Sequence, residues 1–366
     1  MKYIHQLKNW TDFTWDHESI SRLLIQVRHL QGKLTGSLEA LGFELREEAV
    51  LKTLTADVIK STEIEGEILN PEQVRSSVAR RLGMDISGMI RSDRHVEGVV
   101  EMMLDATQLY SRPLTKKRLF SWHAALFPTG RNGMHKILVG KWRRDSTGPM
   151  QVVSGPMGRE KVHYEAPSSK NVEKETTLFL KWFNEETDLD PVLKSGIAHF
   201  WFVTLHPFED GNGRIARALS DMQLARADGS TRRFYSMSSQ IRLEREKYYR
   251  MLEKTQKGDS DITEWLSWYL NCLHESLKAT GTILASVLAK SNFWETNRHT
   301  HFNDRQIKII NRLLDGFDGK LNTSKWAKIN KCSVDTALRD IQELVNKKVL
   351  NKDEAGGRST NYFLNQ

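Results

Sequence analysis

One run of residues sets the character of this chain: His206-Pro207-Phe208-Glu209-Asp210-Gly211-Asn212-Gly213-Arg214-Ile215-Ala216-Arg217. It stands between two segments whose apolar residues recur at helical spacing. Glycines can turn successive backbone N–H groups inward, and the start of a helix adds unpaired N–H groups and a positive dipole end. The pattern therefore predicts a helix, a loop and a second helix that together bind phosphate oxygens.

Four side chains of this run suit phosphate chemistry. Arg214 and Arg217 are three positions apart on one helix, so both guanidiniums can reach the oxygens of a polyphosphate. Asp210 suits Mg²⁺, which proteins hold through one or two carboxylates together with phosphates. An imidazole titrates near neutrality, so His206 can take a proton from an attacking hydroxyl.

The same run contains Gly211-x-Gly213-x-x-Ala216, which matches a short dinucleotide-binding fingerprint. That fingerprint indicates NAD binding only when it joins a strand to a helix inside alternating strands and helices. No such alternation surrounds it, which disfavours an NAD enzyme.

The whole run resembles the signature of the Fic family, His-x-Phe-x-(Asp/Glu)-Gly-Asn-Gly-Arg-x-x-Arg, at every defined position. The resemblance implies a protein adenylyltransferase, a nucleotidyltransferase that moves AMP from ATP to a Ser, Thr or Tyr hydroxyl of a protein and releases pyrophosphate. It also implies a role for each residue of the signature. His206 would be the general base, Phe208 the buried anchor of the loop, and Asp210 the Mg²⁺ ligand. Asn212, with the Gly211 and Gly213 amides, would hold the transferred phosphate, and Arg214 and Arg217 would bind the phosphates beyond it. The kinase-like Doc branch carries Lys where this chain has Gly213, which favours AMP transfer.

A helix predicted near residues 47–65 has a buried apolar stripe, formed by Leu51, Leu54 and Val58. Helical spacing extends this stripe to Ser61 and Glu65 and turns Glu63 and Glu67 elsewhere. A carboxylate on such a stripe is costly unless it meets a cation or hydrogen-bond donors. From the pattern alone, Glu65 is an ordinary carboxylate at the end of a helix.

The segment Ser61-Thr-Glu-Ile-Glu65-Gly66 also resembles the (Ser/Thr)-x-x-x-Glu-(Gly/Asn) inhibitory motif of Fic proteins. The resemblance implies that Glu65 pairs with Arg217 and occupies the guanidinium that orients the terminal phosphate of ATP. Because the motif precedes the signature, it places the chain among family members with an N-terminal inhibitory helix.

Between the inhibitory motif and the signature, Pro71 is suited to the first position of a helix, and further helices are predicted at about 91–111 and 115–127. Three runs, 139–143, 151–153 and 162–165, indicate a β-hairpin. In the Fic family a hairpin at this place, the flap (about 150–166), aligns the target protein by strand addition.

Other residues receive more modest expectations. By position in the family, Tyr249 or Leu252 lines the adenine pocket, while Trp265, Trp268 and Tyr269 are expected to be core residues. His95 and His123 are interpreted as structural. The two cysteines, Cys272 and Cys332, follow no metal-ligand spacing and favour neither a disulfide framework nor a zinc site.

Residues 303–366 are predicted to form a winged helix, with helices at 304–314 and 323–329, a helix capped by Ser333, and a hairpin around Gly356-Gly357. This region holds 12 Lys and Arg against 8 Asp and Glu, half of the net +8 of the 366-residue chain. DNA contact through 303–366 is one interpretation. A protein-binding winged helix is the other, because Asp335, Asp340 and Glu343 add negative charge to the candidate recognition helix.

The expected fold class is mainly α: a Fic-type helical bundle with a β-hairpin flap and a C-terminal winged-helix domain. The expected domains are an N-terminal helical region (1–110), the catalytic core (111–290) and the winged helix (303–366). The expected cofactors are ATP and Mg²⁺. No apolar run reaches the ~18 residues of a membrane span, so we expect a cytoplasmic protein without membrane contact.

Two other functions, besides the disfavoured NAD enzyme, stay open at this point. The same site could remove AMP from a target, with Glu65 orienting a water molecule. The chain could instead be a nucleotide-sensing regulator that binds DNA. Self-modification and a homodimer that buries or frees the inhibitory helix are hypotheses about partners.

Overall fold

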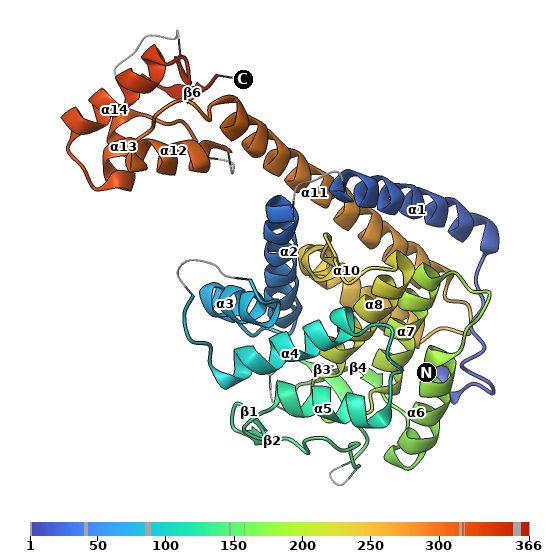
Figure 1. Cartoon of the computed structure of the whole chain (residues 1–366). Coiled ribbons are helices and arrows are strands. Elements are labelled where there is room, and N and C mark those ends of the chain that lie inside the picture. The colour runs from blue at the N-terminus through green and yellow to red at the C-terminus, as the bar shows by residue number, and fades with distance from the viewer. Residues whose placement is uncertain are drawn as a thin grey trace. The chain divides into compact units, whose positions relative to one another are not determined.

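The computed structural model of the chain describes residues 2–39, 43–84, 89–145, 148–156, 158–314, 317, 319–353 and 360–365. Contacts within the chain divide it into two compact units, Met1–Thr280 and Gly281–Gln366. Figure 1 shows that both units are mainly helical, as the sequence predicts. None of the described helices combines the length and the apolar character that crossing a membrane requires.

Helices make up most of the first unit. They are the short 3₁₀ helix η1 (Ile4–Gln6) and the helices α1 (His17–Glu39), α2 (Phe43–Ile64), α3 (Pro71–Arg81), α4 (Arg94–Gln108), α5 (Lys116–Leu126), α6 (Ser169–Asn184), α7 (Pro191–Leu205), α8 (Asn212–Asp228), α9 (Met237–Leu243), α10 (Arg245–Gln256) and α11 (Thr263–Thr296), the last of which continues past Thr280. The strands are β1 (Arg131–Asn132), β2 (His135–Lys136), β3 (Gln151–Ser154) and β4 (Lys161–Glu165).

Helices α7 and α8 pack against each other at the centre of this unit. Every residue of α7 from Val192 to Leu205 is buried, and a helix that is apolar on all sides is expected inside a core. Asp190 fixes the start of α7, because its side chain accepts a hydrogen bond from the Val192 N–H at 2.7 Å. Gly229, in the left-handed conformation, ends α8. The signature run is therefore the connection between two buried helices.

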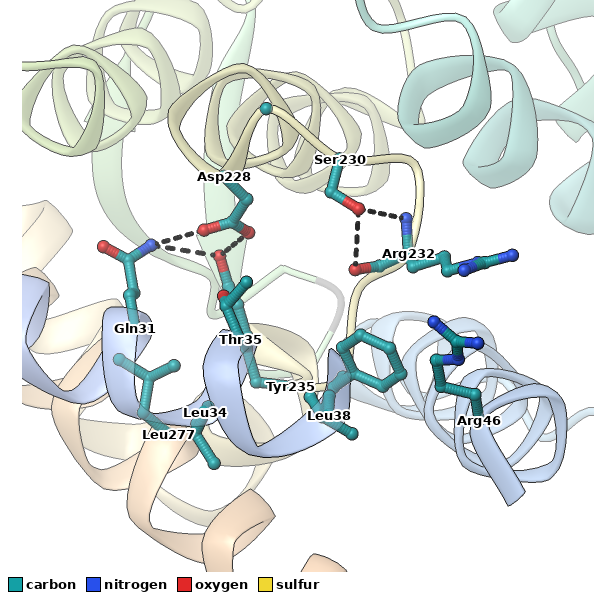
Figure 2. Close-up of a pocket in the computed structure, with 12 residues that line it drawn as sticks. Gln31, Leu34, Thr35, Leu38, Arg46, Asp228, Ser230, Arg232, Tyr235 and Leu277 are labelled. Carbon is teal, nitrogen blue, oxygen red and sulfur yellow. Dashed lines mark hydrogen bonds between the residues drawn. The ribbon is translucent and has the colours of Figure 1, made fainter. Parts of the chain in front are cut away.

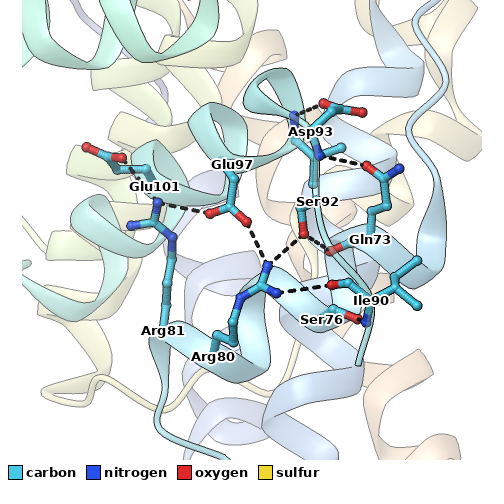
Figure 3. Close-up of polar contacts among 10 residues, drawn as sticks. Gln73, Ser76, Arg80, Arg81, Ile90, Ser92, Asp93, Glu97 and Glu101 are labelled. Atoms are coloured by element: carbon cyan, nitrogen blue, oxygen red, sulfur yellow. Dashed lines mark hydrogen bonds and ion pairs between the residues drawn. The ribbon is translucent and has the colours of Figure 1, made fainter. Parts of the chain in front are cut away.

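A polar network joins the end of α3 to α4 (Figure 3). The Arg80 guanidinium lies 2.8 Å from one Glu97 oxygen, and Arg81 lies 3.2 Å from the other Glu97 oxygen and 3.2 Å from Glu101. Asp93 caps α4 by accepting the Val96 N–H at 2.9 Å. Single exposed pairs contribute only about 0–1 kcal/mol, but together these contacts fix where α4 begins.

The hairpin prediction is correct in part. Strands β3 and β4 pair in antiparallel fashion, with a register shift between Val152 and Val153. Residues 139–143 form no strand, because Arg143 uses its N–H on the Pro207 carbonyl, 3.0 Å away. Strands β1 and β2 form a short hairpin that the sequence did not predict. All strand pairs in the described part of the chain are antiparallel, so the parallel sheet that an NAD-binding fold needs is missing there.

The second unit contains α12 (Asp304–Leu314), α13 (Thr323–Asn330), α14 (Val334–Asn346) and the antiparallel strands β5 (Leu350–Lys352) and β6 (Tyr362–Leu364). Ser333 caps α14, as predicted, by accepting the Thr336 N–H at 3.1 Å. Ala337, Ile341 and Leu344 of α14 are buried, whereas Leu338 is 48% exposed. Gly356 and Gly357 lie outside the described residues. The winged-helix fold and its DNA contact remain predictions.

A cavity of about 260 Å³ lies between α1 and the segment after α8 (Figure 2). Its polar side is a small network, in which Gln31 and Tyr235 donate to Asp228 at 2.8 and 2.6 Å. Burial raises the pKa of Asp228 above its usual range. The residues that line this cavity lie outside 206–217. The candidate site at the signature run therefore lies elsewhere in the same unit.

Candidate active site

His206 terminates α7 in an uncommon backbone conformation. Its φ of 50° is left-handed, and its N–H still donates to the Phe202 carbonyl at 3.0 Å. Non-glycine residues rarely adopt this conformation, and such residues cluster at functional sites. Burial lowers the pKa of His206 to about 4, so the imidazole is neutral at pH 7 and can accept a proton.

The loop after His206 is closed by the side chain of Asn212. Its Oδ1 accepts the Phe208 N–H at 3.0 Å, and its Nδ2 donates to the Phe208 carbonyl at 2.8 Å. The side chain is therefore engaged within the loop, and Asn212 has only its backbone N–H to offer a phosphate. Gly211 is left-handed (φ 78°), which lets α8 begin directly behind the loop with its free N–H groups at the site.

Phe208 is the buried anchor that the sequence predicts. Its ring is completely buried and lies 4.2 Å from the His123 ring at an interplanar angle of 12°. Trp142 packs on it at 5.1 Å. His123 also accepts the Gly140 N–H at 3.1 Å, and its pKa is lowered to about 4 by burial, which fits a structural role.

Arg143 is a site residue that the sequence reasoning missed. Its Nε donates to the His206 carbonyl at 2.7 Å, and its Nη1 lies 2.7 Å from Asp145. The side chain is buried, and its hydrogen bond to the His206 carbonyl helps to fix the left-handed turn there. Residues 139–143 resembled a strand, and nothing in that pattern signalled a buried arginine.

Arg217 lies against the end of α2. Its Nη2 is 2.8 Å from Glu65 Oε1 and donates to the Ser61 carbonyl at 2.7 Å, while its Nε donates to Ser61 Oγ at 2.9 Å. Burial alone would lower the pKa of Arg217, but the Glu65 carboxylate beside it raises that pKa overall. The structure thus brings together the Glu65–Arg217 pair that the family resemblance implied.

Glu65 packs closely against Gly213. A Cβ at this position would collide with Glu65 Oε1. A side chain at this position would therefore force the Glu65 carboxylate to shift away from the signature loop.

Arg214 is held by a second carboxylate, and this corrects the expectation that Glu67 points elsewhere. Arg214 Nη1 lies 3.0 Å from Glu67 Oε2, and His95 Nε2 lies 3.1 Å from the same oxygen. The hydrogen bond from His95, followed by the charge of Arg214, lowers the pKa of Glu67 despite its partial burial. His95 is therefore part of the site rather than only a structural residue.

A single turn delivers both carboxylates. Helix α2 ends at Ile64, where the Gly66 N–H donates to the Glu63 carbonyl at 3.1 Å and the Glu67 N–H donates to the Thr62 carbonyl at 3.3 Å. This pair of bonds is typical of a helix end that is followed by a left-handed residue, and Gly66 is that residue, with a φ of 87°. Helical spacing thus stops before Glu65, which explains why it failed for Glu67.

The arginines keep capacity for a phosphate. Among the described residues, Arg214 Nε and Arg217 Nη1 are buried without a hydrogen-bond acceptor. Asp210 is partly exposed; it accepts the Asn132 side chain at 2.6 Å and its own neighbour's N–H, from Gly211, at 2.5 Å. In the described part of the chain no cluster of three His, Cys, Asp or Glu residues could hold a metal by itself. One carboxylate fits a Mg²⁺ ion that arrives with phosphates.

Tyr249 borders the same site from α10. Its hydroxyl donates to the Ile64 carbonyl at 3.3 Å and lies 3.4 Å from Glu65 Oε2. Burial and the nearby Glu65 carboxylate raise the pKa of Tyr249 to about 12. Leu252 is buried, as are Trp265, Trp268 and Tyr269, which are core residues as predicted. The adenine-pocket role of Tyr249 remains a prediction.

A glycine-rich loop connects two buried helices, with a left-handed histidine before it and two buried arginines after it. Residues 113–224 match the model of the Fic/DOC family, so the chain contains a Fic/DOC domain. Residues 3–84 match a second model, described as Domain of unknown function (DUF4172). This second match includes Ser61, Glu65 and Glu67. The residues that contact Arg214 and Arg217 therefore lie in a different matched region from the two arginines.

Curated relatives carry the same domain. The protein adenylyltransferase Fic of Drosophila virilis is 26% identical over 226 residues, 60% of this chain and 41% of the relative. The protein adenylyltransferase Fic of Drosophila melanogaster is 34% identical over 101 residues, 27% of this chain and 19% of the relative. The chain thus spans about two-fifths, or less, of the length of these relatives.

Solved structures share the fold. A Fic family protein from Desulfovibrio desulfuricans G20 aligns over 96% of this chain and 97% of its own, with 21% identity and a TM-score of 0.54. Residues 134–508 of Fic-1 from C. elegans align over 74% of this chain and 73% of that one, with 20% identity and a TM-score of 0.50. At these identities the likeness establishes the architecture alone.

Proposed function

We propose that the chain is a protein adenylyltransferase that moves AMP from ATP to a Ser, Thr or Tyr hydroxyl of a protein, and that Glu65 holds it inactive. One observation carries this proposal. A neutral His206 directly precedes a loop that leads to the uncapped start of α8, and two buried guanidiniums of that helix each keep an N–H group without an acceptor. The relatives named protein adenylyltransferase support the same activity.

In the proposed reaction the target hydroxyl attacks the α-phosphorus of ATP in line with the leaving pyrophosphate. His206 takes the hydroxyl proton, the new oxygen–phosphorus bond forms, and the bond to pyrophosphate breaks. The N–H groups at the start of α8 hold the α-phosphate, and Arg214 and Arg217 hold the phosphates that leave. Mg²⁺ held by Asp210 would neutralise phosphate charge. Positioning and preorganised charge supply most of the rate.

The proposed inhibition follows from the distances at Arg217. Glu65 and Ser61 together engage Nε and Nη2 of that guanidinium. Arginine binds phosphate through a fork of two N–H groups, and a phosphate that uses the free Nη1 also needs Nη2, which Glu65 occupies. ATP can therefore be oriented for transfer only after Glu65 leaves Arg217.

The target would dock on the β3–β4 hairpin. This sheet has two strands, so a backbone edge is available for an extended segment of another protein. The exposed side chains of β3 offer little selection, which fits positioning of a hydroxyl by the backbone.

The test is incorporation of AMP from ATP labelled at the α-phosphate, with Mg²⁺ and a cell extract as acceptor. We compare the wild type, Glu65→Gly and the Glu65→Gly/His206→Ala double variant. Labelled protein should appear strongly with Glu65→Gly and fall at least about 100-fold in the double variant, because general base catalysis typically contributes that much. Glu63→Gln is the matched control, since Glu63 pairs with Lys60 outside the signature loop.

Two outcomes would contradict the proposal. The first is equal labelling by the double variant, which would remove His206 from the mechanism. The second is no labelling by any variant that binds ATP. In that case AMP released from a pre-labelled acceptor by the wild type, but not by Glu65→Gly, would indicate AMP removal instead.

A further inference from the structure

Arg214 and His95 converge on one oxygen atom. Glu67 Oε2 lies 3.0 Å from Arg214 Nη1 and 3.1 Å from His95 Nε2. Arg214 comes from the signature helix and is 1% exposed, whereas His95 comes from the first turn of α4. Two nitrogen groups from separate elements that share one anionic oxygen form an anion site, and in this structure a carboxylate of the chain itself fills it.

Three features of the surroundings suit a larger anion than a carboxylate. Arg214 Nε is buried and without an acceptor among the described residues, so the guanidinium has a free donor. The first N–H groups of α4 place a positive dipole end beside His95. A hollow of about 590 Å³ adjoins the site and is lined by Glu67 and His95 together with Arg94, Arg131, Asn132 and Asp93. Asp93 is the capping residue of α4, and its carboxylate is engaged by the Val96 N–H.

We propose that Arg214 and His95 form the site for the pyrophosphate part of ATP, and that Glu67 fills this site until the nucleotide replaces it. His95 is thus a positioning residue for the leaving group, and Glu67 is a second resting occupant that acts independently of Glu65. The inference rests on the proposed function, because it assigns a place to the pyrophosphate that AMP transfer releases. It adds two residues, from the turn after α2 and from α4, to a site otherwise built from the signature run.

The two carboxylates should affect different ligands, because they contact different arginines. Glu65 meets Arg217, and Glu67 meets Arg214. Removal of Glu67 should therefore strengthen binding of ligands that carry a pyrophosphate group and leave binding of AMP unchanged. A general loosening of the inhibitory segment would instead affect all of these ligands alike.

The experiment is calorimetric binding of pyrophosphate, ADP and AMP, with Mg²⁺, to the full chain carrying Glu65→Gly so that Arg217 is accessible. In this background Glu67→Gln should raise the affinity for pyrophosphate and ADP about tenfold, because a neutral amide competes poorly for a guanidinium. Adding His95→Gln should lower both affinities about tenfold. Neither change should alter the affinity for AMP by more than about twofold. Glu63→Gln serves as the matched control for a neighbouring carboxylate.

The results that overturn the inference are distinct. If Glu67→Gln leaves pyrophosphate binding unchanged, or if AMP binding rises in parallel, Glu67 does not occupy a pyrophosphate site. If His95→Gln has no effect on pyrophosphate binding, His95 only holds Glu67 and does not bind the leaving group. The same comparison is repeated with Glu67→Ala in place of Glu67→Gln, because alanine also removes the amide. These measurements need no transfer, so they can fail while AMP incorporation succeeds, and they can succeed if it fails.

Discussion

Two glutamate–arginine pairs, two residues apart on one segment, meet the same signature helix in different ways. Glu65 pairs with an Arg217 that Ser61 also holds, and it rests on Gly213. Glu67 pairs with an Arg214 that also faces the Phe127 ring, 5.2 Å away, and lies 3.9 Å from Asp210 Oδ1. The side chains of the two glutamates are similarly exposed, 29% and 28%. Exposure therefore does not distinguish the pairs; the other partners of each arginine do.

The difference concerns how many contacts a nucleotide must replace. At Arg217 it must displace a carboxylate, a hydroxyl and a carbonyl that all come from the end of α2. At Arg214 the one hydrogen-bonded carboxylate to displace is Glu67, because Asp210 lies 3.9 Å away, and His95 then becomes available to the incoming phosphate. We conclude that the first pair is the stronger block on transfer, whereas the second is the more easily exchanged for substrate.

The largest expected effect is that of Glu65→Gly on transfer. Hydrogen bonds to charged groups contribute about 1.5–3 kcal/mol, so releasing Arg217 should raise the rate of AMP incorporation about 10- to 100-fold. Initial rates at saturating ATP measure it, and a thermal melt shows that the variant is folded. A rise no larger than that of Glu67→Gly would abolish the distinction between the pairs.

Glu67→Gly should have a smaller effect of another kind. We expect the KM for ATP to fall about three- to tenfold while kcat changes little, because Arg217 stays blocked in the same fraction of molecules. Steady-state kinetics in the wild type and in the Glu65→Gly background separate the two parameters. A pure increase in kcat would mean that Glu67 acts through Glu65 and not through Arg214.

The family resemblance implied the first pair, whereas helical spacing missed the second for a physical reason. The helical fold, the signature loop, the cap at Ser333 and the core tryptophans all follow from local periodicity and capping, which a sequence displays directly. Glu67 lies beyond the end of α2, where the chain direction is set by Gly66 and not by helical spacing. Arg143 likewise reaches His206 from a segment without regular structure, so no period reveals it.

Gly66→Ala tests the turn on which both pairs depend. A side chain in the left-handed conformation costs about 1–2 kcal/mol, so we expect the free energy of unfolding to fall by about that amount. If the turn relaxes to avoid the strain, both glutamates shift and transfer should rise about two- to threefold. Urea unfolding and labelling measure the two effects.

Gly229→Ala is the matched control for that experiment, because Gly229 is also left-handed at a helix end (φ 61°) but lies beside the cavity at α1. It should show the same loss of stability without a change in transfer. A rise in transfer with both variants would mean that lower stability alone activates the chain, and the turn after α2 would have no special place.

The smallest expected effect concerns the pH dependence of transfer. It tells whether the two glutamates act through the arginines or through the base, His206. Because burial lowers the pKa of His206 to about 4, His206 stays neutral as the pH falls from 7 to 5.5. An imidazole with the ordinary pKa of about 6.5 would lose its neutral form about eightfold over this range, so the transfer rate should change less than twofold instead. The Glu65 carboxylate raises the pKa of His206 somewhat, and its removal lowers that pKa further, which leaves the profile flat. We therefore expect parallel pH profiles for Glu65→Gly and Glu67→Gly, with transfer lost in both only as the pH approaches 4. Profiles that diverge between pH 7 and 5.5 would show that Glu65 restrains the reaction through the protonation of His206, and the two pairs would then differ in chemistry and not only in strength.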